Sequence, residues 1–552
     1  MAARGARLMQ AVRRGAALVL AALLLHLVLI LPNHPGAMTP GALRLVPLEL
    51  PALLLGLLAM PPRARATRAV RAGIVVTLVT LSVLKIADLS MQTAFSRAFN
   101  PVGDARLAVA GLRLLDGSLG AAATALVVVG ACVALALAAT LLWWATGRWS
   151  QVKLRPAPRR LAGGAAVIAA SVAVAEIGAA TGRWSLPVDP PGAAFTARTG
   201  VEKARMVART WADLREFDRL AEADRFAGRD DLFDRIDRDV VVIFVESYGR
   251  SSIDVPLYAP THRATLAAAE GRLRERGLAM RSAYLRAPTR GGQSWLSHAT
   301  VMNGLTVNTA ARYSAALRSD RQTIYHLAAA SGFRTAAVMP AITLAWPEAD
   351  TMGFDTVLPA ADLGYRGLPF DWVTMPDQFT LGALDRLLRS DDGRPRLFAQ
   401  VALASSHAPW TPVAEMVPWD RLGDGTIFDA QAQSGDPPSV VWRDRDRVRD
   451  QYRLAIDHSL RATFDWIAET DGAPLVVVIG DHPPAGFVAQ TSSPDTPVHL
   501  VGPPDLVARI ADWGWSDGLI PEETAPGWPM AALRDRFVRA FTTTESNDGA
   551  TN

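Results

Sequence analysis

The chain has 552 residues, enough for more than one domain, and half of them are hydrophobic. Its 57 Lys and Arg residues face 53 Asp and Glu residues, so a net charge of +4 gives no support for general nucleic-acid binding. The single cysteine, Cys132, lies in an apolar run. The polar part of the chain therefore has no disulfide, thiolate metal site or cysteine nucleophile.

Apolar segments dominate the first 182 residues. Five of them are readable, at roughly Gly15–Leu31, Leu45–Met60, Gly73–Ile86, Ala121–Ala145 and Ala162–Ala180. A spanning helix needs about 20 apolar residues, so the fourth segment is the clearest span and the second, which contains Glu49, is the weakest. We predict a transmembrane domain over residues 1–182 with five spans, the first being a retained anchor and not a signal peptide. The alternative is that the second and third segments are buried or interfacial hairpins.

Basic residues lie in three of the stretches that flank these segments. They precede segment one and separate segments two and three and segments four and five. The positive-inside rule puts these stretches in the cytoplasm, so five spans place the rest of the chain outside a bacterial inner membrane. Glu49, Lys85 and Glu176 are candidates for functional intramembrane charges. For Glu49 and Lys85, a position near a segment end is the simpler explanation.

Residues 183–235 are predicted to form a linker and an amphipathic helix. Trp184–Gly200 is rich in Pro, Gly and Ala, which is typical of a loop, and Val201–Phe226 carries apolar residues at helical spacing. This helix is predicted to lie near the membrane or to pack on the next domain, and a solvated connector is the alternative. Residues 236–545 are predicted as an extracytoplasmic domain, and residues 546–552 as a disordered tail.

The polar domain alternates buried strands with helices. Strands are predicted at Val240–Val245, Thr335–Met339, Leu397–Leu403, Leu475–Ile479 and Val498–Val501. Helices are predicted at Thr261–Arg276, Thr323–Ala330, Gln378–Leu388, Arg447–Glu469 and Met530–Phe541. This alternation predicts an α/β domain with a mostly parallel central sheet, whose ligands bind beyond the carboxyl ends of the strands.

Four reactive side chains follow predicted strands or turns. Glu246 follows the first strand, Asp481 and His482 follow the fourth, and Ser294 lies between a Gly-Gly turn and a predicted helix over Trp295–Gly304. Two carboxylates and an imidazole could hold a divalent cation that activates the Ser294 hydroxyl. The structural alternatives are a loop-capping carboxylate and an ordinary helix N-cap serine.

The motif order resembles a known superfamily. Val-Glu-Ser, a Gly-rich turn with a hydroxyl, Ser-His-Ala-Pro and Gly-Asp-His follow one another as in the alkaline phosphatase/sulfatase superfamily. Five spans before such a domain are similar to the lipoteichoic acid synthase-like membrane proteins, which transfer phosphoglycerol or phosphoethanolamine. The resemblance implies a sulfatase-like fold and one Mn²⁺ or Zn²⁺ bound by Glu246, Ser294, Asp481 and His482. It also implies that Ser294 is the nucleophile, although threonine is usual in this branch.

The resemblance assigns substrate-side roles as well. His407 would stabilise the phosphoryl group or protonate the leaving group, and Trp346 would contact the headgroup. Pro347-Glu348 replaces the basic residue that usually follows that tryptophan, which weakens the case for phosphoglycerol. Arg290 could clamp phosphate, and a surface arginine is the alternative.

Further candidates remain open. They are Thr289 and Ser297 as replacement nucleophiles, and His298, His499 and the pair Asp457-His458, which lies in a long helical pattern where packing is the simpler explanation. No Cys- or Ser-x-Pro-x-Arg signature surrounds Ser294, which argues against sulfate-ester hydrolysis.

Together these features predict a membrane-anchored, metal-dependent phosphotransferase. It would move a phospholipid headgroup through a covalent Ser294 intermediate to a cell-envelope glycan or another acceptor. The alternatives are a phosphodiesterase or phosphatase with water as acceptor, and a non-catalytic sulfatase-like binding domain on a membrane anchor. A transporter is disfavoured, because the apolar segments contain few polar residues.

Overall fold

The computed structural model divides the chain into two compact units, Met1–Asp213 and Leu214–Asn552. The structure describes residues 2–95, 97–105, 111, 112, 115, 120–390 and 393–543. The predicted tail at 546–552 lies outside the described residues.

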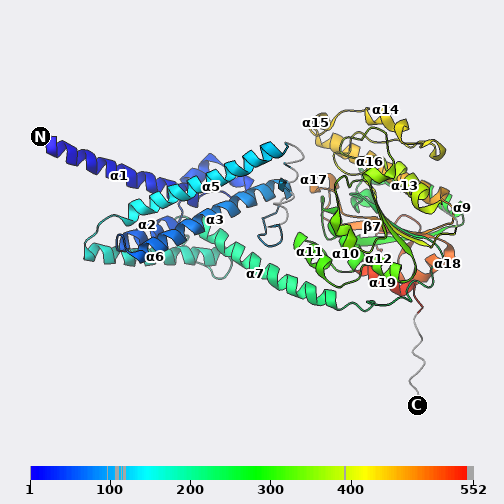
Figure 1. Cartoon of the computed structure of the whole chain (residues 1–552), viewed down its shortest axis with the longest axis horizontal. Helices are drawn as coiled ribbons and strands as arrows, with labels where there is room; N and C mark the ends of the chain where they lie inside the picture. Colours follow the sequence, from blue (N-terminus) through cyan, green and yellow to red (C-terminus); the bar gives the residue numbers. More distant parts are fainter. Residues whose placement is uncertain are drawn as a thin grey trace, which may run out of the picture. The chain divides into compact units, whose positions relative to one another are not determined.

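The first unit is helical (Figure 1). Its main helices are α1 (Ala2–Leu29), α2 (Glu49–Ala59), α3 (Arg65–Phe95), α5 (Ala121–Ser150) and α6 (Pro156–Ala180), and α7 (Phe195–Glu222) leads out of it. Four of these helices, α1, α3, α5 and α6, are long and apolar enough to cross a membrane among the described residues. The second predicted segment forms α2, which has 11 residues because a non-helical stretch with Pro47 precedes it, so its crossing of the membrane stays a prediction.

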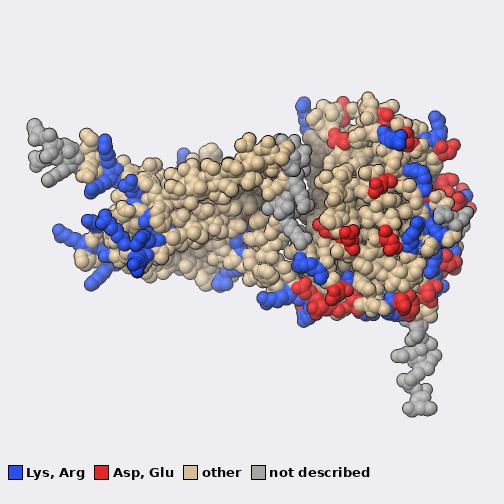
Figure 2. Space-filling model, viewed as in Figure 1, with Lys and Arg blue, Asp and Glu red and all other residues tan. Residues whose placement is uncertain are grey.

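The basic turns of this unit lie at one end. The Arg159 side chain at the start of α6 donates to the carbonyl oxygen of Ala59 at the end of α2, at 2.9 Å. Arg71 near the start of α3 donates to the carbonyl oxygen of Trp143 near the end of α5, at 2.6 Å. Figure 2 shows Lys and Arg side chains gathered at one end of these helices, with a largely uncharged stretch beyond them. The α2–α3 and α5–α6 turns therefore share one end, as the positive-inside prediction requires.

The buried charges of this unit have structural partners. Glu49 Oε1 accepts from the backbone N–H groups of Thr196 and Ala197 in the first turn of α7, at 2.8 and 2.9 Å. Lys85 Nζ donates to the carbonyl oxygen of Leu29 and to Thr196 Oγ1. Glu176 forms an ion pair with Arg198 of α7. These contacts tie α7 to the helical bundle, which accounts for the charges without a transport role.

The second unit contains a nine-stranded mixed sheet. Its strands are β1 (Val240–Val245), β2 (Ala279–Arg286), β3 (Arg334–Met339), β4 (Thr356–Pro359), β5 (Leu397–Ala402), β6 (Leu475–Gly480), β7 (Asp495–Gly502), β8 (Ser516–Asp517) and β9 (Gly527–Pro529). The order is β4-β3-β5-β1-β6-β7-β2-β8, with β9 paired to β2. The five strands from β4 to β6 are parallel, whereas β7 pairs antiparallel with both β6 and β2. The prediction of a mostly parallel sheet is confirmed.

Helices cover both faces of this sheet (Figure 1). One face packs against α9 (Ala259–Glu275), α13 (Asp377–Leu384) and α16 (Arg445–Glu469). The other packs against α10 (Ser294–Asn303), α12 (Ile324–Ala330) and α19 (Ala532–Ala540). Because strand side chains alternate, Val241 and Ile243 of β1 enter the first core, and Val242 and Phe244 enter the second. This burial on both faces explains the continuous apolar run in the sequence of β1.

Candidate active site

Two adjacent strand ends bring the carboxylates together. Glu246 follows β1, and the chain turns sharply after it because Ser247 has a left-handed backbone, with φ of 57°. Asp481 follows β6, and its Oδ1 accepts a hydrogen bond from the backbone N–H of Ser247 at 2.8 Å. Gly480 permits this approach, since a Cβ there would lie 1.9 Å from the Tyr248 carbonyl oxygen. The local backbone thus fixes both carboxylates at one edge of the sheet.

Ser294 reaches this edge from the first turn of α10. Gln293 before it is left-handed, with φ of 66°, and Gly291 has φ of 69°. A non-glycine residue in this region costs roughly 1–3 kcal/mol, and such strain is concentrated at functional sites. The Ser294 hydroxyl donates to Glu246 Oε2 at 2.7 Å and lies 3.2 Å from His482 Nε2. The start of a helix such as α10 presents backbone N–H groups, which makes it a favourable place for an anion.

Glu246, Asp481 and His482 form a buried cluster. One ligand atom from each lies within 4.8 Å of the others, and the three side chains are 8%, 1% and 1% exposed. His482 Nδ1 lies 3.0 Å from the carbonyl oxygen of Pro483, which can only accept, so Nδ1 carries the proton and Nε2 points into the cluster. Metal-binding histidines are usually oriented in this way. The mixed O/N donor set fits Mn²⁺ or Zn²⁺.

The electrostatics of this cluster favour added positive charge. Burial and the neighbouring Glu246 charge raise the pKa of Asp481 to about 8. Burial alone would lower the pKa of His482, but the Asp481 and Glu246 charges raise it to about 9. Burial opposes ionisation of Glu246 too, yet the charge of His482 holds the pKa of Glu246 well below its usual range. Protons on Asp481 and His482 relieve the crowding of acids, and a divalent cation would do so more effectively.

His407 lies on the loop after β5. The preceding Ser406 donates its hydroxyl to the backbone carbonyl of Glu246 at 2.7 Å, which ties this loop to the cluster. His407 Nδ1 lies 2.5 Å from the carbonyl oxygen of Ala408, so Nδ1 carries the proton and Nε2 is left to exchange one. The His407 charge also helps to lower the pKa of Glu246.

Trp346 and Arg290 stay predictions. Trp346 is half-buried and packs near Phe354, with ring centroids 6.5 Å apart. Arg290 is exposed and donates to the carbonyl oxygen of Ser493 at 2.6 Å. Within the described residues, neither side chain is hydrogen-bonded to the cluster.

Ser294 is the hydroxyl, among the three candidate nucleophiles, that hydrogen-bonds to the cluster. Thr289 Oγ1 and Ser297 Oγ lie 3.5 Å from each other, and Ser297 is fully buried. These two hydroxyls therefore fit a structural role in the loop before α10 and in the helix itself.

The additional histidines differ in their surroundings. His499 is a satisfied core residue, with Nδ1 2.7 Å from Ser282 Oγ and Nε2 3.2 Å from the Tyr248 hydroxyl. The His298 ring packs at a tilt against Phe244, with ring centroids 4.1 Å apart, and burial lowers the pKa of His298 to about 4. His458, in α16, lines a groove on the side of the sheet opposite to α10.

Two residues beside His407 were not predicted. Asp377 in the first turn of α13 is fully buried, and its Oδ1 accepts from the backbone N–H groups of Ala404 and Ser405, both at 2.8 Å. Trp372 is 51% exposed and stacks on the His407 ring, with centroids 4.0 Å apart. Both contact the loop after β5, which is distant from them in the sequence, so no local pattern could have identified them.

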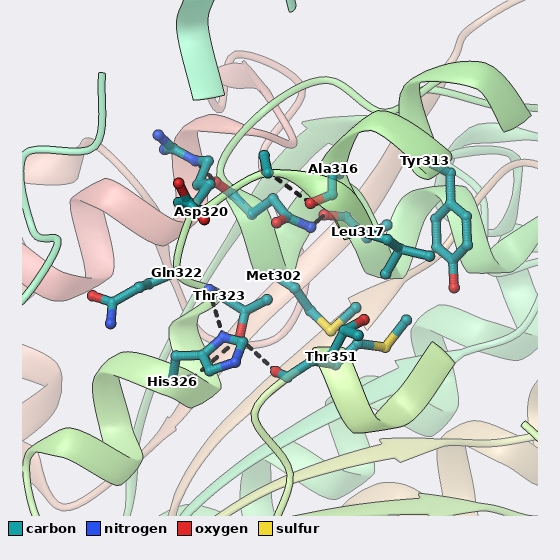
Figure 3. Close-up of a pocket in the computed structure, with 14 residues that line it drawn as sticks. Met302, Tyr313, Ala316, Leu317, Asp320, Gln322, Thr323, His326 and Thr351 are labelled. Atoms are coloured by element: carbon teal, nitrogen blue, oxygen red, sulfur yellow. Dashed lines mark hydrogen bonds between the residues drawn. The ribbon is translucent and has the colours of Figure 1, made fainter. Parts of the chain in front are cut away.

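A separate cavity of about 280 Å³ lies among α10, α11 (Ala310–Arg318) and α12 (Figure 3). Figure 3 shows Met302, Tyr313 and Leu317 around it, and the His326 ring bonded to Thr323 at its wall. Of the described residues that line it, none is a predicted site residue. The cavity is therefore distinct from the Glu246–Asp481–His482 cluster.

Comparison with known proteins finds similarity only at the level of structure. No family model and no curated protein matches the chain. Similar solved structures include a lipoteichoic acid synthase from Listeria monocytogenes (13% identity, covering 52% of this chain and 71% of that one, TM-score 0.34). A protein in the alkaline phosphatase superfamily from Vibrio parahaemolyticus has 15% identity, coverage of 52% and 69%, and a TM-score of 0.32.

The soluble domain of lipooligosaccharide phosphoethanolamine transferase A from Neisseria meningitidis is also similar (10% identity, coverage of 57% and 89%, TM-score 0.37). These are the kinds of protein that the motif order predicted. Since the identities and TM-scores are low, the activity of this chain is inferred from its own side chains.

Proposed function

We propose that the second unit is the catalytic domain of a membrane-anchored, metal-dependent phosphotransferase. It would move a phospholipid headgroup, phosphoglycerol or phosphoethanolamine, through a covalent Ser294 intermediate to a cell-envelope acceptor. The observation that carries the proposal is the position of the Ser294 hydroxyl. It lies 2.7 Å from Glu246 Oε2 and 3.2 Å from His482 Nε2, at a helix start and beside two buried acids.

Glu246, Asp481 and His482, with the Ser294 oxygen, would hold one Mn²⁺ or Zn²⁺. When bound, the cation would lower the pKa of the Ser294 hydroxyl and offset charge on the phosphate. Backbone N–H groups at the start of α10 would orient the phosphate oxygens. This arrangement gives the cluster both a nucleophile and a place for the anionic group that it attacks.

The residues support a balanced two-step transfer. In the first step, Ser294 Oγ, whose proton passes to solvent, bonds to phosphorus. The bond from phosphorus to the diacylglycerol oxygen breaks, and that oxygen takes a proton from His407. In the second step, an acceptor hydroxyl gives its proton to His407, its oxygen displaces Ser294, and Ser294 regains a proton from solvent.

The helical unit would keep this domain beside its lipid donor in a bacterial inner membrane. The shared end of the basic turns supports a cytoplasmic location for them and an extracytoplasmic location for the catalytic domain. This orientation requires α2 and its flanks to return the chain across the membrane. Labelling of a cysteine introduced at Ser434 in a Cys132→Ala background, with a membrane-impermeant reagent on intact cells, tests it. Labelling only after lysis would contradict it.

Intact-mass spectrometry tests the chemistry. The full chain is incubated with manganese and mixed bacterial phospholipids, then cooled to slow turnover. We expect an adduct of phosphoglycerol or phosphoethanolamine mass on the wild type and none on Ser294→Ala. Ser297→Ala, which removes a neighbouring hydroxyl on the same helix, should keep the adduct. An adduct on Ser294→Ala, or none on the metal-loaded wild type, would overturn the proposed nucleophile.

A further inference from the structure

A groove of about 580 Å³ runs along one face of α16. From this helix it is lined by Arg447, Gln451, Leu454, Asp457, His458 and Arg461, and opposite them lie residues 411–416 and 434–436. At 1.5 Å per residue, the helical stretch from Arg447 to Arg461 extends about 21 Å. A groove of this length suits an extended chain of linked units better than a compact molecule.

His458 at the base of the groove lacks a partner. Its side chain is 4% exposed, and neither ring nitrogen has a hydrogen-bond partner among the described residues. The adjacent Asp457 is engaged by Thr265 and by Arg461, at 2.9 Å for the ion pair. An unpartnered buried polar group is costly, so this position calls for a ligand group from the groove.

The chemistry of His458 indicates which group that is. Burial lowers the pKa of His458, which keeps the ring neutral near pH 7. A neutral imidazole offers one N–H donor and one nitrogen acceptor. A ligand hydroxyl can serve either of them, whereas a phosphate can only accept from the first and an ammonium can only donate to the second.

The charged walls of the groove point to a neutral ligand. Arg447 pairs with Asp436, and Arg461 pairs with Asp457. Each pair presents fixed donors and acceptors, and Glu415, which also lines the groove, adds one negative charge. Such walls can bond to many hydroxyls, and a single excess negative charge gives no attraction to a polyanion.

The groove continues toward His407. A small adjoining pocket is lined by Ser405 and His407, and it shares Thr411, Pro412 and Ala414 with the groove. The groove and the proposed catalytic loop are therefore contiguous.

An exposed tryptophan stands beside that junction. Trp442 is 45% exposed, stacks on Trp410 with centroids 5.8 Å apart, and donates to the carbonyl oxygen of Pro409 at 3.2 Å. Tryptophan is highly buried in most proteins. An indole fixed in this position can pack against the apolar face of a sugar ring.

We propose that this groove binds the acceptor as an extended, neutral, hydroxyl-rich chain of the oligosaccharide class, with His458 holding one hydroxyl at its base. That the bound oligosaccharide is the acceptor rests on the proposed transfer function. Oligosaccharide binding itself is independent of that function and is measured separately.

Binding is tested on the full chain in lipid nanodiscs, because glycoside detergents would compete. The probes are neutral gluco-oligosaccharides of different linkages, followed by saturation-transfer NMR. Leu454→Trp fills the groove from a half-buried position, and His458→Ala removes the basal contact. Asp450→Ala is the matched control, since Asp450 pairs with Arg453 on α16 outside the groove.

We expect saturation transfer with the wild type and Asp450→Ala, and a signal weaker by about tenfold with Leu454→Trp and His458→Ala. Equal signals in all four proteins, or none with the wild type, would overturn the binding site. A second readout separates the two proposals. If oligosaccharides bind in this pattern but no Ser294 adduct forms, the binding site in the groove is confirmed and the transfer function is contradicted. An adduct that oligosaccharides discharge equally fast in the wild type and Leu454→Trp overturns the groove as the acceptor site.

Discussion

The buried charges of the helical unit and those of the Glu246–Asp481–His482 cluster are balanced in different ways. In the helical unit, Lys203 pairs with Asp88, and Lys85 donates to a backbone carbonyl and to Thr196. Each of these three charged side chains has a protein partner of suitable sign or dipole. Such closed pairs need nothing from outside the chain, and they serve to join α7 to the bundle.

The Glu246–Asp481–His482 cluster is not closed in this sense. Glu246 and Asp481 lie together around one buried imidazole, and a further charge that lowers the pKa of Glu246 comes from His407. Protons or a cation from solution would balance the two acids. Buried charge in this chain therefore indicates function where the protein leaves it unbalanced, and architecture where the protein pairs it.

The largest expected effect comes from removing one acid of the cluster. Asp481→Asn keeps an oxygen for the backbone N–H of Ser247 but loses the ligand charge. We expect loss of the bound metal and a fall of at least about 10³-fold in Ser294 adduct formation, since metal catalysis contributes several kcal/mol. Metal analysis and adduct rates measure this. Asp239→Asn at the other end of β1, which disturbs ion pairs with Arg389 and Arg394, should keep its metal.

The same substitution in the helical unit should act on stability. Asp88→Asn leaves Lys203 buried without its counter-charge, and breaking such a pair costs about 3–5 kcal/mol. We expect a lower thermal unfolding midpoint of the full chain in nanodiscs, with metal content unchanged. The double variant Asp88→Asn/Lys203→Met should recover most of the loss. If the double variant were as unstable as the single one, the loss of stability would not come from the unpaired charge of Lys203.

A pH series distinguishes the open cluster from the closed pairs. The pKa of Asp481, about 8, lies above its ordinary value of 3.8, and that of His482, about 9, lies above 6.5. The folded, metal-free protein therefore holds these protons more tightly than the unfolded chain. Their stabilisation is complete below the ordinary pKa values and is lost as the pH rises through about 8 to 9.

Each such proton contributes a slope of about 1.4 kcal/mol per pH unit within its window. Manganese replaces the protons, so the gap in unfolding midpoint between metal-bound and metal-free protein should widen as the pH rises from about 6 to about 9. Thermal unfolding at matched ionic strength measures the gap. A constant gap would mean that the cluster does not exchange protons for metal.

The sequence predicted β1, β5 and β6 almost to the residue, because strands buried on both faces read as unbroken apolar runs. It did not predict β2, whose run includes Arg281, Ser282 and Arg286, or the short edge strands β4, β8 and β9. Their pairing depends on neighbours that lie far away in the sequence. The second apolar segment forms a shorter helix than its composition predicted, because the stretch with Pro47 before Glu49 is not helical.

The candidate site divides in the same way. Glu246, Asp481 and His482 could be predicted because each follows a recognisable strand, and Ser294 because a Gly-rich turn precedes it. Asp377, Trp372 and the His458 groove could not, since each depends on contacts between elements that the sequence does not order in space.

The smallest predicted effect concerns Trp372, which stacks on His407. Trp372→Ala removes the stacked ring that restrains the His407 imidazole, without touching the metal ligands. We expect metal content to be unchanged and transfer to fall by about tenfold, in the range for a misplaced acid–base group. Trp372→Phe should restore most of the rate, because a flat ring can still stack. If the rate were equally low in Trp372→Phe, Trp372 would be assigned to contact with the substrate and not to the positioning of His407, the proton donor.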